Sequence, residues 1–96
     1  KYQRGAEVPK GTRFEVIPGH QPLYFTENGW RVLEGLREKS TQTGISMVDL
    51  ALAWTIGQPG ITSVLVGSRG IEQVDQAFRA EAIEVSAELR AELNQL

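Results

Sequence analysis

One short apolar segment limits what this chain can fold into. Ile61 to Val66 (ITSVLV) is rich in β-branched residues, is flanked by glycines and predicts a short buried strand. A buried strand leaves its backbone N–H and C=O groups unpaired unless other strands lie along both of its edges. The rest of the sequence predicts helices before and after it and no second clear strand. We therefore expect an α/β fold in which this segment belongs to a sheet or barrel with several more strands.

Two helices are expected before the strand. The first begins near Thr26 or Asn28, either of which can cap it, and ends at Gly44. The second opens on the capping pair Ser46 and Asp49 and ends at a Gly-Gln-Pro-Gly turn. Its apolar residues cover nearly the whole circumference, which predicts a helix that is buried on more than one side.

Two further helices are expected after the strand. The first runs from about Ile71 to Arg79, and its inward face is expected to hold the large apolar residues Ile71, Val74 and Phe78. The second follows Ser86, a good N-cap, and its apolar stripe consists of Leu89, Leu93 and Leu96. In this pattern one strand lies between two pairs of helices.

The stretch from residue 1 to residue 25 predicts a loop, because it holds three of the four prolines and three of the ten glycines and shows no periodicity. With 96 residues, the chain is long enough for one domain at most. We therefore interpret residues 1–96 as a single partial domain, in which residues 1–25 form a loop and residues 26–96 a helix–helix–strand–helix–helix segment.

Charge and composition exclude several classes of partner and site. Ten Lys and Arg against twelve Asp and Glu give a net charge of −2, so the basic surface that nucleic acid or an anionic membrane requires is missing. The chain has no cysteine, which excludes disulfides and thiolate metal sites. The apolar run from Met47 to Ile56 is too short to span a bilayer, and no signal-peptide pattern opens the sequence. We expect a cytoplasmic protein without a metal site, in which His20 is a solvated loop residue.

The turn Gly67-Ser68-Arg69-Gly70 lies where the expected strand meets the next helix. A helix N-terminus presents unpaired backbone N–H groups and the positive end of the helix dipole, so an anion such as a phosphate can bind there. A tight turn with nothing bound explains the same residues. From the spacing alone the turn with nothing bound is the favoured interpretation, because so short a motif often occurs by chance.

The segment SMVDLALAWTIGQPGITSVLVGSRGIEQVDQAF resembles the C-terminal part of the aldo-keto reductases, which are NADPH-dependent oxidoreductases with a (β/α)8 barrel fold. The family pattern there is a helix carrying ALAW, a Pro-Gly turn, the eighth strand, and a Gly-(Ala/Ser)-Arg turn leading into a helix. The opening KYQRGAEVPKGTRF is similar to the segment after the seventh strand of the family. The resemblance covers essentially all 96 residues and implies a C-terminal fragment of a TIM-type barrel.

The resemblance also implies the cofactor contacts. Ser68 and Arg69 match the family residues that hold the 2′-phosphate of NADPH, and Gln73 matches a further contact to that end of the cofactor. A hydroxyl, a guanidinium and helix-terminal N–H groups together supply charge-assisted hydrogen bonds to a dianion. Gly67 would let the backbone approach the ligand closely.

Two departures from the family pattern matter. Gln76 and Ala77 stand where the family commonly has Glu and Asn for the adenine amino group; Gln76 retains a carbonyl acceptor, whereas Ala77 has no polar group. The catalytic Asp, Tyr, Lys and His of the family lie in earlier strands and loops, and the residues of those types in this chain do not match their positions: Lys1, Tyr2, Lys10, His20, Tyr24 and Asp49. We therefore assign no catalytic residue and expect this chain to be inactive on its own.

Three functional hypotheses remain. The chain is either the C-terminal NADPH-binding segment of an aldo-keto reductase, a truncated non-catalytic module that self-associates as a homo-oligomer or domain-swapped dimer, or a phosphate-binding module for another nucleotide. The second hypothesis follows from the unpaired strand edges and the apolar helix stripes, because both require a partner.

Overall fold

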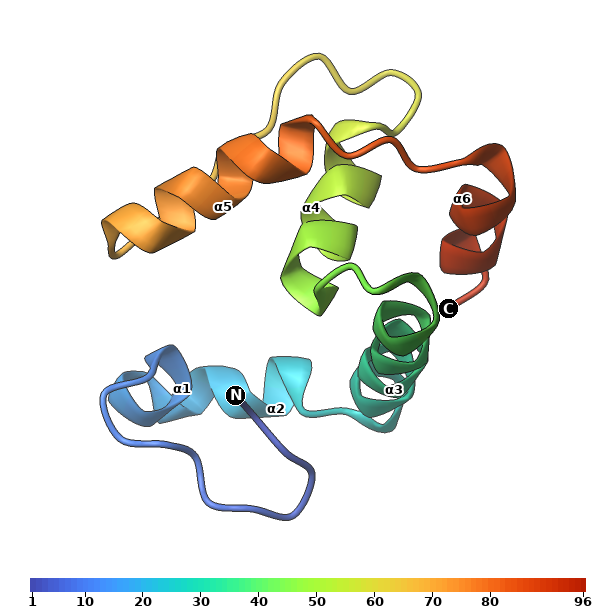
Figure 1. Ribbon diagram of the computed structural model, residues 1–96. Coiled ribbons are helices and arrows are strands. Elements are labelled where there is room, and N and C mark those ends of the chain that lie inside the picture. Colours follow the sequence, from blue (N-terminus) through green and yellow to red (C-terminus); the bar gives the residue numbers. More distant parts are fainter. The chain divides into compact units, whose positions relative to one another are not determined.

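The computed structural model describes residues 1–96, and it consists of helices and turns without any strand (Figure 1). The chain divides into two compact units, Lys1–Glu34 and Gly35–Leu96. The division falls within α3 (Glu27–Thr43), whose first part belongs to the first unit and whose remainder belongs to the second. No helix combines the length and the apolar character that crossing a membrane requires.

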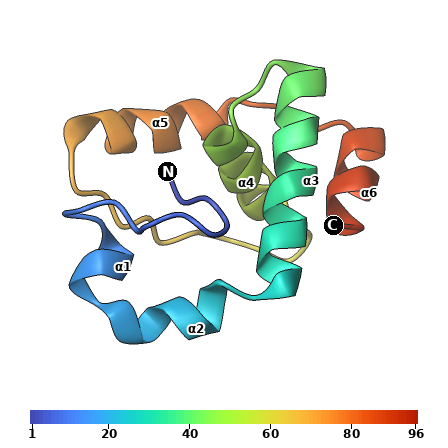
Figure 2. The same cartoon turned by 90° about the horizontal axis from the view of Figure 1, so that it is seen from below.

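Three short helical turns occupy much of the stretch that the sequence predicts as a loop (Figure 2). They are α1 (Arg13–Val16), the 3₁₀ turn η1 (Pro18–His20) and α2 (Gln21–Tyr24). Proline stands at the start of both η1 and α2, as Pro18 and Pro22. The proline ring presets a helical φ at a position where the missing N–H costs nothing, which explains why turns form in a segment without helical periodicity.

The core of the first unit is a cluster of aromatic rings. The ring of Phe14 lies 4.9 Å from the rings of both Tyr2 and Phe25, and Phe25 lies 5.1 Å from Trp30. These rings meet at tilted or edge-to-face angles, which is the arrangement that their quadrupoles favour. Phe14 is buried, so the cluster joins the N-terminal residues to α1 and to the beginning of α3.

The ends of α3 confirm the expected boundaries. Thr26 is the residue that caps it, because its Oγ1 accepts a hydrogen bond from the Gly29 N–H at 3.0 Å. The other capping candidate, Asn28, instead accepts a hydrogen bond from Arg31 Nη2 through its side-chain oxygen. At the C-terminal end Gly44 has a φ of +73°, a left-handed conformation that glycine adopts without strain.

The helix α4 (Met47–Ile56) is the central element of the second unit. Its N-terminus is capped as expected: Ser46 Oγ accepts a hydrogen bond from the Asp49 N–H at 3.1 Å and donates one to the Asp49 carboxylate at 2.7 Å. Leu50 is fully buried and Ala53 is 4% exposed. These two residues belong to the apolar core of the second unit.

Helix α5 (Ile71–Glu81) packs against α4, and Ala80 near its C-terminal end is buried (Figure 1). The last helix, α6 (Ala87–Asn94), begins after Ser86, whose Oγ accepts a hydrogen bond from the Leu89 N–H as expected. Leu93 on this helix is also buried.

Two polar contacts join α6 to α4. Trp54 Nε1 donates a hydrogen bond to Asn94 Oδ1 at 2.7 Å, and Arg90 Nη1 donates one to the carbonyl oxygen of Trp54 at 3.3 Å. The guanidinium therefore lies at the C-terminal end of α4, where the helix dipole favours a positive charge. An ion pair between Lys39 and Glu92 connects α6 to α3 as well.

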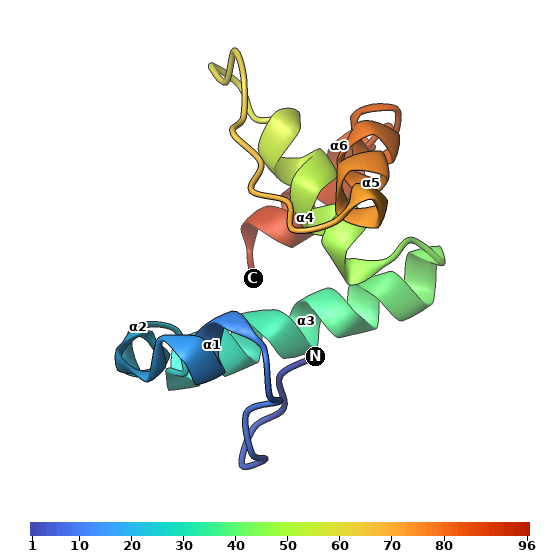
Figure 3. The ribbon, with the colours of Figure 1, turned by 90° about the vertical axis from the view of Figure 1, so that its left-hand side faces the viewer.

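The expected strand is wrong. Residues 61–68 run between α4 and α5 without regular secondary structure, and Figure 3 shows this connection in yellow as a plain coil. Leu65 is fully exposed. The physical reason is the pairing requirement stated above: the chain provides no second strand, so the β-branched residues of this segment have no ladder to join.

The expected inward face of α5 is wrong as well. Ile71 is 80% exposed, Val74 42% and Phe78 69%. In an α/β fold such a face packs on the neighbouring strands. Without a sheet, α5 buries mainly the side that meets α4, and these three side chains remain accessible.

We expect Gly57→Ala to destabilise the second unit. Gly57 is the C-cap of α4, and a Cβ at this position would collide with Arg90 Nη2 and lie 3.2 Å from the Ala53 carbonyl oxygen. We expect a loss of at most about 1 kcal/mol in the free energy of unfolding, measured by urea titration, because the guanidinium is the end of a flexible side chain and gives up only its hydrogen bond to the Trp54 carbonyl oxygen when it moves. Gly19→Ala is the control, since a Cβ there meets no atom within 4 Å. An equal loss for Gly57→Ala in an Arg90→Ala background would contradict this explanation.

Candidate functional site

The turn that the sequence singles out, Gly67 to Gly70, lies between the irregular segment and α5, and all of its residues are exposed. Gly70 is the N-cap of α5 and has an extended backbone with a φ of −154°, and no side chain caps the helix at this residue. The backbone N–H groups of Ile71 and Glu72 fall in the first turn, where a helix has no internal acceptor for them. The turn therefore presents backbone donors at an accessible helix N-terminus.

Gln73 holds this turn in place. Its side-chain oxygen Oε1 accepts a hydrogen bond from the Arg69 N–H at 2.7 Å, while its own N–H donates to the Gly70 carbonyl oxygen at 3.2 Å. The sequence resemblance implied only that Gln73 contacts a ligand. The signal for its second role is its position, since a Gln at the third residue of a helix often reaches back to a backbone N–H before the helix.

The two glycines of the turn are not required by the conformation of the chain itself. Neither Gly67 nor Gly70 has a φ in the left-handed region, and a Cβ on either would meet no other atom within 4 Å. The space beside both backbones is therefore open. This openness fits the expectation that a ligand approaches the backbone closely at Gly67.

The charges near the turn have both signs. Arg69 supplies the cation, whereas Glu72 lies in the first turn of α5 and Asp75 follows one turn later. Gln76 is half-buried and lies three residues after Gln73, so the two amide side chains share one side of the helix. Of the expected cofactor residues, the structure thus brings Ser68, Arg69 and Gln73 together at the N-terminus and places Gln76 one turn further along.

Hydroxyl, guanidinium and first-turn N–H groups are donors, so this arrangement can bind an anion. The acidic Glu72 beside these donors opposes the same anion and limits how tightly it is held.

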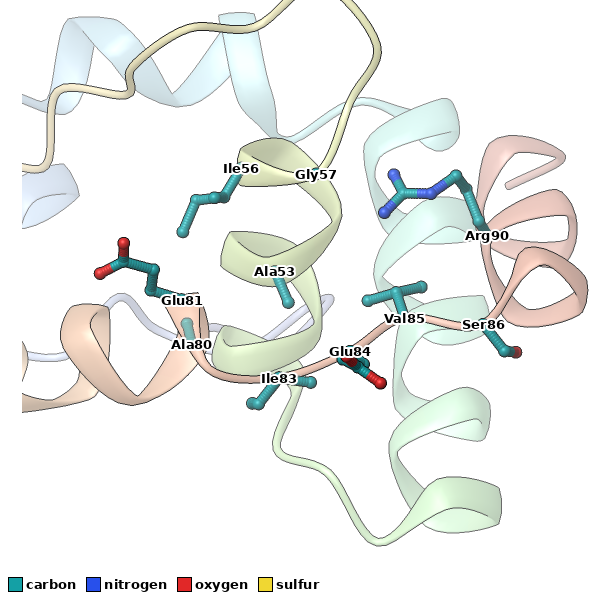
Figure 4. A pocket seen from close by; sticks show the side chains of 10 residues that line it. All are labelled: Ala53, Ile56, Gly57, Ala80, Glu81, Ile83, Glu84, Val85, Ser86 and Arg90. Carbon is teal, nitrogen blue, oxygen red and sulfur yellow. The ribbon is translucent and has the colours of Figure 1, made fainter.

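Two pockets lie elsewhere in the second unit, and none of the expected site residues lines either of them. The larger has a volume of about 460 Å³ and is drawn in Figure 4. It lies where the C-terminal ends of α4 and α5 meet the segment leading to α6. Its lining residues are Ala53, Ile56, Gly57, Ala80, Glu81, Ile83, Glu84, Val85, Ser86 and Arg90. Arg90 and Glu81 stand at opposite ends of it. The other, of about 350 Å³, lies under the irregular segment and is lined by Ile56, Thr62, Ser63, Val64, Val66, Ala77, Phe78 and Glu81.

We expect Gln73→Met to loosen the turn, because methionine is similar in length but has no oxygen to accept the Arg69 N–H. Hydrogen exchange of the Arg69 amide should become faster, and the free energy of unfolding should fall by about 0.5–1.5 kcal/mol. Amide exchange followed by NMR measures the first effect. Gln76→Met, on the same helix, is the matched control and should leave the Arg69 amide unchanged; similar acceleration in both variants would contradict the role of Gln73.

Comparison with known proteins identifies a family and several relatives. The model of the aldo/keto reductase family matches residues 1–96. The chain is 33% identical over 84 residues to the L-glyceraldehyde 3-phosphate reductase of Escherichia coli O157:H7, a match that covers 83% of this chain and 24% of that protein. The protein of the same name from Escherichia coli K12 is 32% identical over the same coverage.

A probable voltage-gated potassium channel subunit beta of Arabidopsis thaliana is 26% identical over 83 residues, which are 83% of this chain and 25% of that protein. The chain thus spans about a quarter of the length of the curated relatives that it matches. The family match confirms the resemblance read from the ALAW, Pro-Gly and Gly-Ser-Arg elements. The chain belongs to the aldo/keto reductase family, whose members are oxidoreductases with a (β/α)8 barrel fold.

Proposed function

We propose that this chain is the C-terminal cofactor-binding segment of an NADPH-dependent aldo/keto reductase. The observation that carries the proposal is the turn before α5, where Ser68 and Arg69 lie beside an exposed helix N-terminus in a chain that matches this family throughout. The family generally uses NADP(H), which supplies the hydride for carbonyl reduction when bound. In this proposal the contribution of the 96 residues is to hold the adenosine end of the cofactor.

The 2′-phosphate of NADPH is the part of the ligand that this turn suits. Ser68 Oγ can donate one hydrogen bond, and the Arg69 guanidinium can donate two in parallel to a phosphate. The first-turn N–H groups of α5 add the positive end of the helix dipole. Because NADH has no 2′-phosphate, these donors would discriminate between the two cofactors.

Gln73 contributes to this site in two ways. Its Oε1 is engaged by the Arg69 N–H, which holds the backbone of the Ser68–Arg69 turn in one conformation. Its Nε2 carries two further N–H donors that can reach a phosphate oxygen. A donor set that is already ordered before the ligand arrives loses less conformational entropy on binding.

The chain offers fewer polar contacts to the adenine of the cofactor than to its 2′-phosphate. Gln76 retains a carbonyl oxygen that could accept the exocyclic amino group, whereas Ala77 contributes no polar group. We therefore expect most of the affinity to come from the phosphate contacts. Such a site would also bind 2′-phosphorylated adenosine.

We expect Arg69→Ala to weaken NADPH binding by about 1.5–3 kcal/mol, because one charge-assisted contact is lost. NADH binding should not change, since it lacks the phosphate. Titration calorimetry of NADPH, NADH and 2′-phosphorylated adenosine measures both effects. Arg79→Ala, in the last turn of the same helix, is the control for a change in net charge. Equal affinity of the unmodified chain for NADPH and NADH would refute the proposal.

A second variant tests whether a negative charge at the N-terminus of α5 weakens NADPH binding. Glu72→Gln removes a negative charge from the first turn of α5, so the affinity for NADPH should rise about two- to fivefold at low salt. The same substitution removes a favourable charge–dipole contact and should slightly destabilise the unliganded helix. Asp75→Asn is the matched control one turn away, and it should have a smaller effect. A lower NADPH affinity for Glu72→Gln would mean that the phosphate does not bind at this helix end.

We infer a second candidate function, self-association of the chain as a non-catalytic module, from a separate observation. Leu65 is fully exposed, and Ile71 and Phe78 are 80% and 69% exposed. Large apolar side chains that are exposed on a surface are a common sign of a site that another protein covers. Sedimentation of the chain over a range of concentrations tests this candidate, and a monomer throughout would refute it.

A further inference from the structure

We propose that the cofactor site of this chain does not select adenine as the base. In this proposal Gln76 accepts hypoxanthine, which carries an exocyclic carbonyl group, as readily as adenine, which carries an exocyclic amino group. The inference rests on the proposed function and deepens it, since it concerns the base that accompanies the 2′-phosphate. The residues that carry it all belong to α5 and to the turn before this helix.

The two amide side chains on one side of α5 differ in what holds them. Gln73 Oε1 accepts the Arg69 N–H at 2.7 Å, which gives the Gln73 amide one fixed orientation. No hydrogen bond within the chain engages the amide of Gln76, and neither of its polar atoms is buried. The Gln76 amide is therefore free to turn either its oxygen or its nitrogen toward a ligand.

An amide that can turn suits both purines equally. Adenine presents an amino donor next to a ring nitrogen that accepts, whereas hypoxanthine presents a carbonyl acceptor next to a ring N–H that donates. The terminal torsion of glutamine is broad, so a half-turn exchanges the positions of its oxygen and its nitrogen at little cost. Gln76 can thus form two hydrogen bonds with the edge of either base.

Selection of adenine would require a group that only accepts hydrogen bonds. Such a group rejects hypoxanthine, because two acceptors that face each other are both left without a donor. Ala77, next to Gln76, has no polar group. Asp75 has an acceptor-only carboxylate, but it lies two residues after Gln73 and therefore faces a different side of α5.

The charged residues one turn away from Gln76 do not select adenine either. Glu72 precedes Gln76 by four residues and lies in the first turn of α5, where the proposed function places the phosphate and not the base. Arg79 follows Gln76 by three residues and carries only N–H donors, which suit the carbonyl group of hypoxanthine. The contact to the base therefore depends on Gln76.

The test uses the full 96-residue chain and titration calorimetry with two ligands, NADPH and the analogue of NADPH in which hypoxanthine replaces adenine. We expect the analogue to bind at least about half as tightly as NADPH, since the number of hydrogen bonds is the same. Gln76→Glu should make the chain prefer NADPH about three- to tenfold, because a carboxylate of the same length only accepts. The ratio of the two affinities is the readout, because the added negative charge weakens the binding of both phosphates alike.

Gln76→Met is the matched control, because it keeps the length of the side chain and removes both the donor and the acceptor. It should weaken the binding of both ligands and leave the ratio of their affinities as in the unmodified chain. A preference of the unmodified chain for NADPH of more than about fivefold would overturn the inference, since it would correspond to a hydrogen bond that only adenine makes. An unchanged ratio in Gln76→Glu would overturn it as well, because Gln76 would then not face the base.

The results also separate this inference from the proposed function on which it rests. Either of the two contrary results leaves the preference for NADPH over NADH intact, so the phosphate contacts would stand while the assignment of Gln76 fails. Equal affinity for NADPH and NADH, or no binding of either ligand, would overturn both.

Discussion

The second unit depends on the burial of α4. Leu50 has no exposed surface and Ala53 almost none, because α4 is the helix against which α5 packs and to which α6 is joined by Trp54 and Arg90. The sequence predicts that this helix is covered on more than one side, but Val48 is 51% exposed and Ala51 is exposed as well, so the structure fully buries only the side that carries Leu50 and Ala53. The positions of α5 and of the turn that precedes it follow from this packing, so the candidate cofactor site depends on a core that lies outside it.

The sequence was sufficient to predict features that local interactions determine. The helix boundaries at Thr26, Gly44, Ser46 and Ser86 agree with the structure, because caps and left-handed glycines act within a few residues of the helix end. Such local signals do not determine whether Ile61–Val66 forms a strand. Whether a β-branched segment becomes a strand depends on partners that are distant in sequence, and those partners are not part of the described chain.

The candidate site also combines features that the sequence predicts with features that only the structure shows. Family resemblance singled out Ser68, Arg69 and Gln73, and the structure places them at one helix N-terminus. The hydrogen bond from the Arg69 N–H to Gln73 was not predicted, although a Gln at the third helical position is a recognisable signal for such a contact. The exposure of Phe78 was also missed, because a periodic pattern identifies the apolar face of a helix but not whether anything covers it.

The contact between Gly57 and Arg90 links two positions that are 33 residues apart in the sequence. A Cβ at position 57 would meet the guanidinium where it now lies, and from this place the guanidinium donates its hydrogen bond to the Trp54 carbonyl oxygen. A change at either position therefore alters the contact that the other one makes. Relatives with a bulkier residue in place of Gly57 should more often have a shorter side chain in place of Arg90. Such paired replacements would show that α4 and α6 still pack together at this point.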